Sequence, residues 1–308
     1  GSTVVGAVPD LSNVANVVVP SGMTVVYDTA VAGPVHTTVD NSGRINVNLM
    51  STETLPMVIN GSGVVALTNS GQITLSGINS YTGGTVLASG STVIATNSRS
   101  LGLNPAITSD GGALKIAPAV TFTSLNSTGT LTLLSDVITT GEQSYDNLLL
   151  ANTVNGLTSG TTTLSTQNSN IRISGTINGV NGITKNVLRT NGLIDSITYS
   201  TQSLNVNAGN AQATIGDTVG GNLRINKLQI TASRINLYAD ILTQGTQTYN
   251  GNVYIGDSTD MGRALTIGAL YSRYGSYFDY TLGALVSEVA YLQANPIYAR
   301  TLISEDPA

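Results

Sequence analysis

The stretch Gly71-Gln-Ile-Thr-Leu-Ser-Gly-Ile-Asn-Ser-Tyr-Thr-Gly-Gly-Thr85 decides how the rest of the chain is interpreted. Ile73 and Leu75 alternate with polar residues, which is the period of a strand with one buried face. Gly83 and Gly84 give the backbone the freedom that a sharp turn needs. The stretch therefore predicts a strand, a tight polar turn, and a second strand that begins at Thr85.

The composition favours many short strands over a few long helices. Only 9% of the 308 residues are charged, against roughly 25% in an average globular protein. Glycine occurs 34 times, tryptophan is absent and phenylalanine occurs twice, while 41% of the residues are hydrophobic. We expect a core built from Val, Ile, Leu and Ala, a mixture that suits strands joined by tight polar turns.

Charge and cysteine content exclude several classes of function. The net charge is −5, and the 12 basic residues are scattered along the chain, so no basic face for nucleic acid is predicted. The lack of cysteine excludes disulfides, thiol catalysis and cysteine-ligated zinc. No apolar run reaches the ~18 residues of a membrane-spanning helix. The first residues do not have the charged n-region and apolar h-region of a signal peptide, and we expect the chain to be a piece of a longer protein.

Short alternating runs dominate the sequence until its last forty or so residues. Each run has three to six residues and is bounded by Gly, Asn, Ser or Thr. This density fits an all-β sandwich, a barrel or a solenoid. The clearest runs are Arg44–Leu49, Thr130–Leu133, Asn170–Ile173, Ser203–Val206, Asn222–Ile225 and Arg234–Leu237.

An internal repeat favours the solenoid. Residues 131–145 parallel residues 235–249 at an offset of 104, and both share the string Asp-(Val/Ile)-x-Thr-x-Gly-x-Gln-x-Tyr. Asp136 corresponds to Asp240, and Tyr145 corresponds to Tyr249. Recurrence of a strand–turn–strand unit is typical of a solenoid, in which each coil stacks on its neighbour.

Two of these motifs also resemble known families. The stretch from Gly71 to Thr85 resembles the autotransporter-associated β-strand repeat of bacterial passenger domains. The pattern around Thr243–Val253 resembles the late β-helix region of filamentous-haemagglutinin-type exoproteins, which leave the cell by two-partner secretion. Together the resemblances cover Gly63 to Ile267. They imply an all-β, right-handed parallel β-helix (a β-solenoid) in a secreted or cell-surface protein.

The chain also departs from the pattern of a complete exoprotein. The Asn-Pro-Asn motifs of an N-terminal secretion domain are missing, since Asn104-Pro105 stands alone. A C-terminal run of amphipathic strands for a membrane barrel is missing too. We therefore expect an internal or processed segment, with N-terminal β-rich coils or a cap over residues 1–62 and the parallel β-helix over residues 63–268.

Residues 269–308 are expected to form a C-terminal cap or the start of another module. Ala284–Leu292 has apolar residues at spacings of three and four, which predicts one short helix that ends before Pro296. Tyrosine has a flat apolar face and a hydroxyl group, which suit stacking on sugars and packing at protein interfaces. We predict an interaction surface at the four tyrosines of this segment, Tyr271, Tyr274, Tyr277 and Tyr280.

No catalytic, cofactor or metal site is predicted. His36 is the single histidine, and a strand or loop histidine without a catalytic role is favoured over a nucleophilic triad. Asp136 and Asp240 are interpreted as turn residues that accept backbone N–H bonds. Asp257 and Asp260 lie close in sequence, but calcium needs six to eight oxygens, so a solvated turn is favoured.

The recurring tyrosines have a structural and a functional interpretation. Tyr81, Tyr145 and Tyr249 follow the same kind of turn. A stack of rings that closes the coil is favoured over a binding surface at these three positions.

The sequence thus predicts a non-enzymatic segment of an adhesin-like exoprotein, in which a stiff β-helical stalk or filament-forming scaffold presents loops for attachment. The expected partners are host-cell or matrix glycans and proteins, neighbouring cells, an outer-membrane transporter during secretion, and other copies joined end to end. A polysaccharide-degrading β-helix enzyme and the passenger of a secreted toxin are the alternatives.

Overall fold

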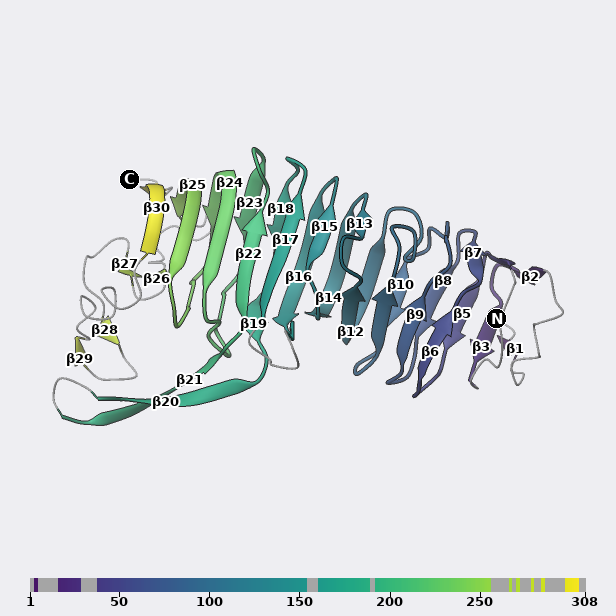
Figure 1. Cartoon of the computed structure of the whole chain (residues 1–308), viewed down its shortest axis with the longest axis horizontal. Helices are drawn as coiled ribbons and strands as arrows, with labels where there is room; N and C mark the ends of the chain where they lie inside the picture. The colour runs from purple at the N-terminus through teal and green to yellow at the C-terminus, as the bar shows by residue number, and fades with distance from the viewer. Residues whose placement is uncertain are drawn as a thin grey trace. The chain divides into compact units, whose positions relative to one another are not determined.

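The computed structural model describes residues 3–4, 16–28, 38–153, 160–188 and 192–255, and the short strands 266–267, 270–271, 278–279, 284–285 and 297–304. Every regular element in this part of the chain is a strand. The chain divides into two compact units, Gly1–Asp146 and Asn147–Ala308. Figure 1 shows the strands of both units with their labels.

The first unit is built from short strands, most of them two to four residues long. Its strands are β1 (Thr3–Val4), β2 (Asn16–Val19), β3 (Thr24–Tyr27), β4 (Thr38–Asn41), β5 (Arg44–Val47), β6 (Thr52–Leu55), β7 (Val58–Asn60), β8 (Val64–Leu67), β9 (Gln72–Leu75), β10 (Thr85–Leu87), β11 (Thr92–Ala95), β12 (Ala106–Ile116), β13 (Thr121–Phe122), β14 (Leu125–Leu133) and β15 (Val137–Thr139). The boundary between the units falls within β16 (Gln143–Leu150).

The second unit contains longer strands. They are β17 (Thr161–Thr166), β18 (Ile171–Ile173), β19 (Ile177–Gly179), β20 (Gly182–Leu188), β21 (Ile194–Ser200), β22 (Ser203–Asn207), β23 (Gln212–Ile215), β24 (Leu228–Leu237), β25 (Gln247–Ile255), β26 (Thr266–Ile267), β27 (Leu270–Tyr271), β28 (Phe278–Asp279), β29 (Ala284–Leu285) and β30 (Ile297–Ser304).

Parallel pairing between successive coils defines the fold. In the first unit Thr24 of β3 pairs with Arg44 of β5, which pairs with Val64 of β8. In the second unit β22, β24, β25 and β30 pair in parallel in the same way. The predicted parallel β-helix is therefore confirmed, and the units together contain about 11 turns.

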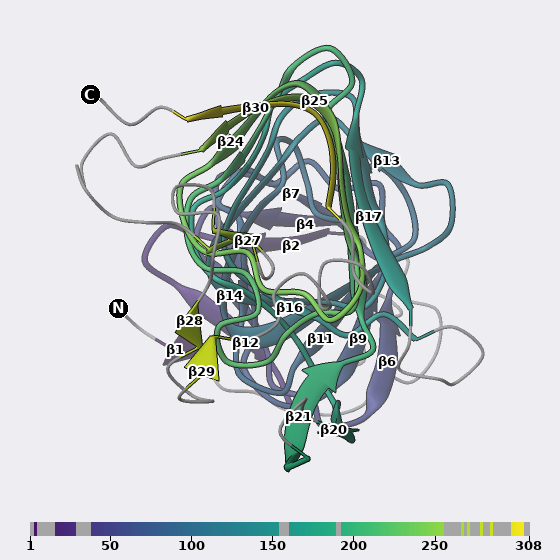
Figure 2. The same ribbon diagram turned by 90° about the vertical axis from the view of Figure 1, so that its left-hand side faces the viewer.

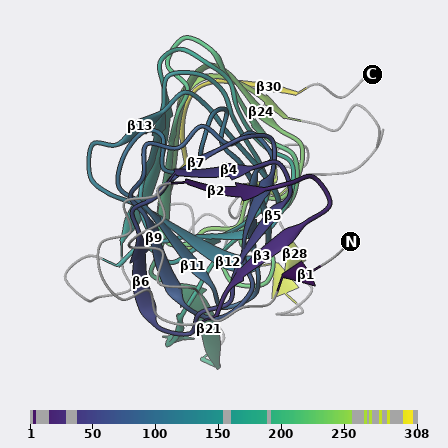
Figure 3. The same ribbon diagram turned by 90° about the vertical axis from the view of Figure 1, so that its right-hand side faces the viewer.

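A further parallel sheet closes one side of the coils in the first unit. It contains β2, β4 and β7, with Val17 paired to Val39 and Val39 to Ile59. Figure 3 shows β2, β4 and β7 as a layer separate from β3 and β5. Val39 and Ile59 are buried, so this sheet covers the apolar interior that the other strands leave open.

The core consists of aligned aliphatic side chains. Strand alternation turns every second residue inward, and parallel stacking in register places like residues above one another. One such column in the first unit runs from Ile73 through Val93 to Leu114, and all three are buried. The expected Val, Ile, Leu and Ala core is thus observed, with buried tyrosines at some of the corners.

The stretch from Gly71 to Thr85 forms two strands and a corner. Ile73 and Leu75 of β9 are buried, and β10 begins at Thr85 as predicted. The backbone N–H of Gly83 donates to the carbonyl of Gly63 at 3.1 Å. Gly43, Gly63 and Gly83 form a column in which a Cβ on each would collide with backbone of the preceding coil.

A long antiparallel hairpin interrupts the parallel framework of the second unit. Strands β20 and β21 pair from Gly182 with Ser200 to Leu188 with Ile194. Figures 1 and 2 show this hairpin leaving the stacked strands of its unit near β19 and projecting away from them. Because of this insertion, Thr161 of β17 pairs with Ser203 of β22.

The C-terminal region differs from its prediction where a helix was expected. Ala284 and Leu285, the first residues of the expected helix, form strand β29, which pairs antiparallel with β28. Residues 286–292 of that expected helix lie outside the described residues. Strand β30 pairs in parallel with β25, so a strand from residues 269–308 adds to the stacked coils.

Candidate functional site

The first copy of the internal repeat forms a buried polar corner. The side-chain amide of Gln143 donates to the carbonyl of Val137 and to Oγ1 of Thr139, each at 3.1 Å. Its oxygen accepts a hydrogen bond from the hydroxyl of Tyr145 at 2.8 Å. Thr139 in turn donates to the carbonyl of Gly141 at 2.6 Å. Thr139, Gln143 and Tyr145 are all buried.

The second copy reproduces this corner bond for bond. Gln247 donates to the carbonyl of Ile241 at 3.3 Å and to Oγ1 of Thr243 at 3.1 Å. The hydroxyl of Tyr249 donates to Gln247 at 2.6 Å, and Thr243 donates to Gly245 at 2.8 Å. The Thr-x-Gly-x-Gln-x-Tyr string therefore encodes a self-satisfied polar network inside each coil, because buried polar groups need partners.

Tyr81 occupies a related corner in the opening stretch. Its hydroxyl lies 2.7 Å from Oγ1 of Thr85, and both residues are buried. Tyr81, Tyr145 and Tyr249 are each no more than 1% exposed. Their burial supports the structural interpretation, since a ring enclosed in the coil offers no face to an external ligand.

Alkaline pH should destabilise both units through these tyrosines. Burial raises the pKa of Tyr27 from 10.0 to about 12, and it also raises the pKa of Tyr81, Tyr145 and Tyr249 above the ordinary value of a tyrosine. The folded state therefore holds these protons more tightly than the unfolded chain. Their contribution is complete below pH 10 and is lost as the pH rises through the folded values. Above pH 10 the free energy of unfolding should decrease by up to about 1.4 kcal/mol per pH unit for each tyrosine. The unfolding midpoint should decrease with it.

The control for this pH dependence is Tyr81→Phe. The variant lacks one of the titrating hydroxyls, so the slope of stability against pH should become shallower for the first unit. Circular dichroism would follow unfolding, and tyrosinate absorbance would follow ionisation. An unfolding midpoint that stays constant between about pH 9 and 12 would contradict the prediction.

The predicted turn aspartates are found at the surface of their coils. Asp136 is exposed and Asp240 is half-buried. Asp146, near Tyr145, accepts a hydrogen bond from the backbone N–H of Gly129 at 3.0 Å. The capping role of Asp136 and Asp240 stays a prediction.

Several predicted positions lie outside the described residues. These are Tyr274, Tyr277, Tyr280, His36, Asp257 and Asp260. Tyr271 belongs to strand β27, where it pairs with Thr266. The tyrosine interaction surface thus stays a prediction.

Metal-binding side chains do not gather in the described part of the chain. Among these residues, no three or more His, Cys, Asp or Glu lie where they could hold one metal ion. Nor does the described part form a helix that is long and apolar enough to cross a membrane.

The outer face of the second unit carries a polar ladder that the sequence analysis missed. The guanidinium of Arg234 lies 3.6 Å from the ring centroid of Tyr254, and its Nε donates to Asn236 at 2.7 Å. Asn236 donates to Oγ1 of Thr214 at 3.1 Å. These residues come from β23, β24 and β25, and only the register of the coils brings them together.

The hairpin is the second feature that sequence reasoning missed, and the best candidate for an interaction surface. Ile183 is 46% exposed, Leu193 59% and Ile194 69%. Thr184 bonds to Thr198 at 3.0 Å, and Ser196 donates to Asn186 at 2.9 Å. A signal was present, because Asn191-Gly192 stands between the two strands, and Asn-Gly is a strong hairpin indicator.

In comparisons with known proteins, no family model, no curated protein and no solved structure matches this chain.

Proposed function

We propose that this chain is a segment of a secreted or cell-surface adhesin-like exoprotein. The stacked coils serve as a rigid stalk or filament-forming scaffold, and elements that leave the coils make the attachments. The proposal rests on one observation. A repetitive parallel framework is interrupted by a long antiparallel hairpin, β20–β21, that projects from its unit and exposes large apolar residues.

The positions of the repeated residues support separate roles for the coils, as scaffold, and the hairpin, as attachment element. The two copies of the repeat share the Thr, Gln and Tyr residues of the buried corners, and these side chains bond to one another within each corner. Repetition thus maintains the scaffold. The hairpin belongs to no repeat, and its exposed side chains are available to a partner. Binding residues commonly lie on such excursions from a rigid scaffold.

The expected partners follow from this role. They are glycans or proteins of a host cell or its matrix, neighbouring cells, and an outer-membrane transporter during secretion. End-to-end association of copies is also proposed, since strand edges at the end of a stack of coils favour pairing.

Removal of the hairpin should abolish attachment and leave the coils folded. Gly182 and Ser200 are paired, so a short Gly-Ser turn can replace residues 183–199 without parting the two ends. Beads coated with the parent chain should bind host, matrix or bacterial surfaces, and the variant should bind at least about tenfold less, because few residues dominate an interface. Circular dichroism would verify the fold.

The matched control removes exposed apolar residues elsewhere. Ile78→Ser combined with Leu103→Ser changes two exposed side chains of the first unit and should leave bead binding unchanged. Equal binding by the parent and the hairpin variant would refute attachment through the hairpin. A parent chain that binds none of these surfaces would refute the adhesin role itself.

The carbohydrate-active alternative keeps a separate test. Glycosidic hydrolysis requires two carboxylates about 5–10 Å apart, and cleavage of acidic polysaccharides by the purified chain would establish it.

A further inference from the structure

The hairpin β20–β21 is a long two-stranded ribbon that pairs with no other strand along most of its length. Only its base is attached, where Tyr199 bridges to Arg224 and the N–H of Ser200 donates to the carbonyl of Arg224 at 2.7 Å. A lone two-stranded ribbon is marginally stable in water. Its exposed apolar side chains therefore need an explanation in terms of a partner.

Of the described apolar side chains of the ribbon, the more exposed ones lie toward its far end. Among the hairpin side chains that the structure describes, Leu193 and Ile194 are the most exposed apolar ones, and they lie beside its turn. Ile183, nearer the base, is less exposed. Between them, the polar pairs Thr184 with Thr198 and Asn186 with Ser196 bond to each other across the strands. The ribbon thus has an apolar end and a polar middle whose groups already have partners.

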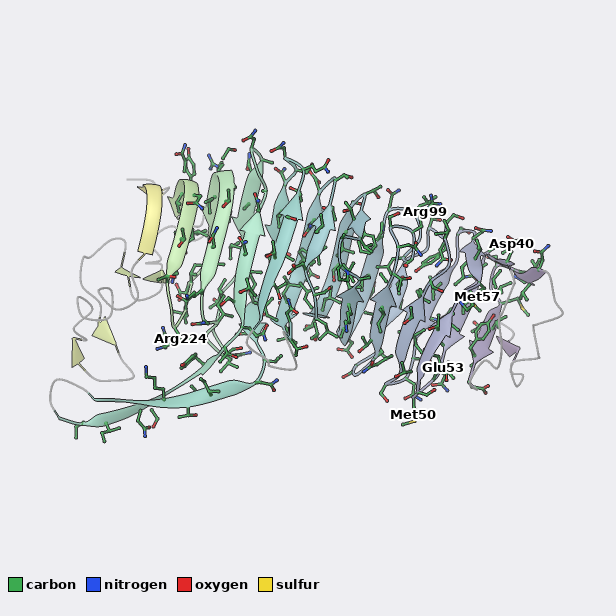
Figure 4. All side chains as sticks on the ribbon, in the orientation of Figure 1. Asp40, Met50, Glu53, Met57, Arg99 and Arg224 are labelled. Atoms are coloured by element: carbon green, nitrogen blue, oxygen red, sulfur yellow. The ribbon has the colours of Figure 1, made fainter. Side chains whose placement is uncertain are left out.

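The charge around the hairpin is opposite to that of the whole chain. From Arg172 to Lys227 the sequence has five basic and two acidic residues, a net charge of +3, whereas the chain carries −5. Lys185 on the ribbon and Lys227 near its base are exposed. Figure 4 shows Arg224 close to the point where the ribbon leaves the coils. Electrostatics therefore favours an anionic partner at this place.

We propose that the hairpin docks on an anionic lipid surface. Leu193 and Ile194 enter the boundary between head groups and acyl chains, and Lys185 and Lys227 are attracted to the lipid phosphates, as in other basic and apolar interfacial segments. A second copy of the chain is a poorer occupant, because two hairpins brought together would oppose two regions of the same positive charge. The proposal deepens the attachment role proposed above and rests on it.

A single hairpin of this kind gives weak, reversible binding. We expect a partition constant on the order of 10⁴ M⁻¹ or less, comparable to that of one myristoyl chain. Several copies on one filament would bind a membrane far more tightly through effective concentration. Weak binding by the monomer is therefore part of the proposal.

Co-sedimentation of the full chain with lipid vesicles tests whether the hairpin docks on an anionic lipid surface. The chain should bind vesicles of equal parts phosphatidylcholine and phosphatidylserine, and bind vesicles of pure phosphatidylcholine much less. About 1 M salt should weaken binding to the anionic vesicles, since the screening length then falls to about 3 Å. Leu193→Ser with Ile194→Ser should lower the partition constant by about tenfold or more. Lys185→Glu should lower it several-fold on anionic vesicles alone.

The control is Ile78→Ser, which changes a residue of the first unit with the same 59% exposure as Leu193. It should bind vesicles like the parent. All variants are surface substitutions, so circular dichroism should show an unchanged fold.

Equal vesicle binding by the parent and the Leu193/Ile194 variant would overturn the proposal, as would a folded parent that binds no anionic vesicle. A parent that forms dimers by light scattering, dispersed by the same two substitutions, would also overturn it in favour of a second copy. Failure on vesicles combined with hairpin-dependent bead binding would refute the lipid surface and leave the adhesin role standing.

Discussion

Replacing Gln247 by leucine should lower the free energy of unfolding of the second unit by about 3–5 kcal/mol, since each buried group left unpaired costs about 1–3 kcal/mol. The substitution deprives the hydroxyl of Tyr249 of its acceptor and the carbonyl of Ile241 of its side-chain donor. It also removes a bond to Thr243, which keeps its bond to Gly245. Hydrogen exchange of the β25 amides and the thermal midpoint would measure the loss.

A double-mutant cycle isolates the network. Tyr249→Phe removes the hydroxyl that Gln247→Leu leaves unpaired, so the double variant should recover about 1–2 kcal/mol relative to the sum of the single changes. Gln229→Leu changes an exposed glutamine of β24 and should cost little. Additive single effects, or a Gln247→Leu loss below about 1 kcal/mol, would show that the corner is not a coupled network.

The second large effect is expected for Gly83→Ala in the first unit. A Cβ at this position would collide with the carbonyl group of Gly63 on the preceding coil, and backbone cannot move aside as a flexible side chain can. The two coils would have to separate at a corner where Gly83 donates to Gly63. We expect a loss of about 3 kcal/mol or more, at or above the usual cost of overpacking.

Gly90→Ala separates this collision from simple backbone strain. Gly90 has a φ of +79°, and the nearest atom to an added Cβ is Ser70 Cβ at 3.6 Å. The substitution should cost only the roughly 1–2 kcal/mol of a left-handed alanine. Chemical denaturation of the three proteins would compare them. Equal losses at the two positions would refute the role of the close coil contact.

Local alternation and the internal repeat were sufficient to predict the architecture. Ile73 and Leu75 revealed a half-buried strand, and the recurrence of Tyr145 at Tyr249 indicated stacked coils. Strand alternation and turn chemistry depend on adjacent residues, and the repeat is visible as a recurrence of the same string in the sequence. The repeated Thr-x-Gly-x-Gln-x-Tyr string did not reveal that its Gln and Tyr side chains bond to each other. That prediction would have needed the backbone path at the corner.

The polar ladder on the outer face was beyond sequence reasoning for a different reason. Thr214, Asn236 and Tyr254 meet because β23, β24 and β25 stack in one register. The sequence separation between Thr214 and Asn236 differs from that between Asn236 and Tyr254, because the turns between the strands differ in length. No regular spacing in the sequence therefore marks these residues as neighbours. The hairpin, in contrast, is indicated in the sequence by Asn191-Gly192. It was not predicted because all strands were expected to belong to parallel coils.

The hairpin also has a consequence for the order in which the chain folds. Typical coils close when residues about twenty positions apart meet, as for Ile59 and Asn79 at a separation of 20. The coil that contains the hairpin closes over 42 residues, as for Asn170 and Gln212. A doubled loop costs about 0.6 kcal/mol more entropy, and contacts between distant residues form slowly. We therefore expect coil formation in the second unit to pause at this step, unless the hairpin folds first and shortens the path.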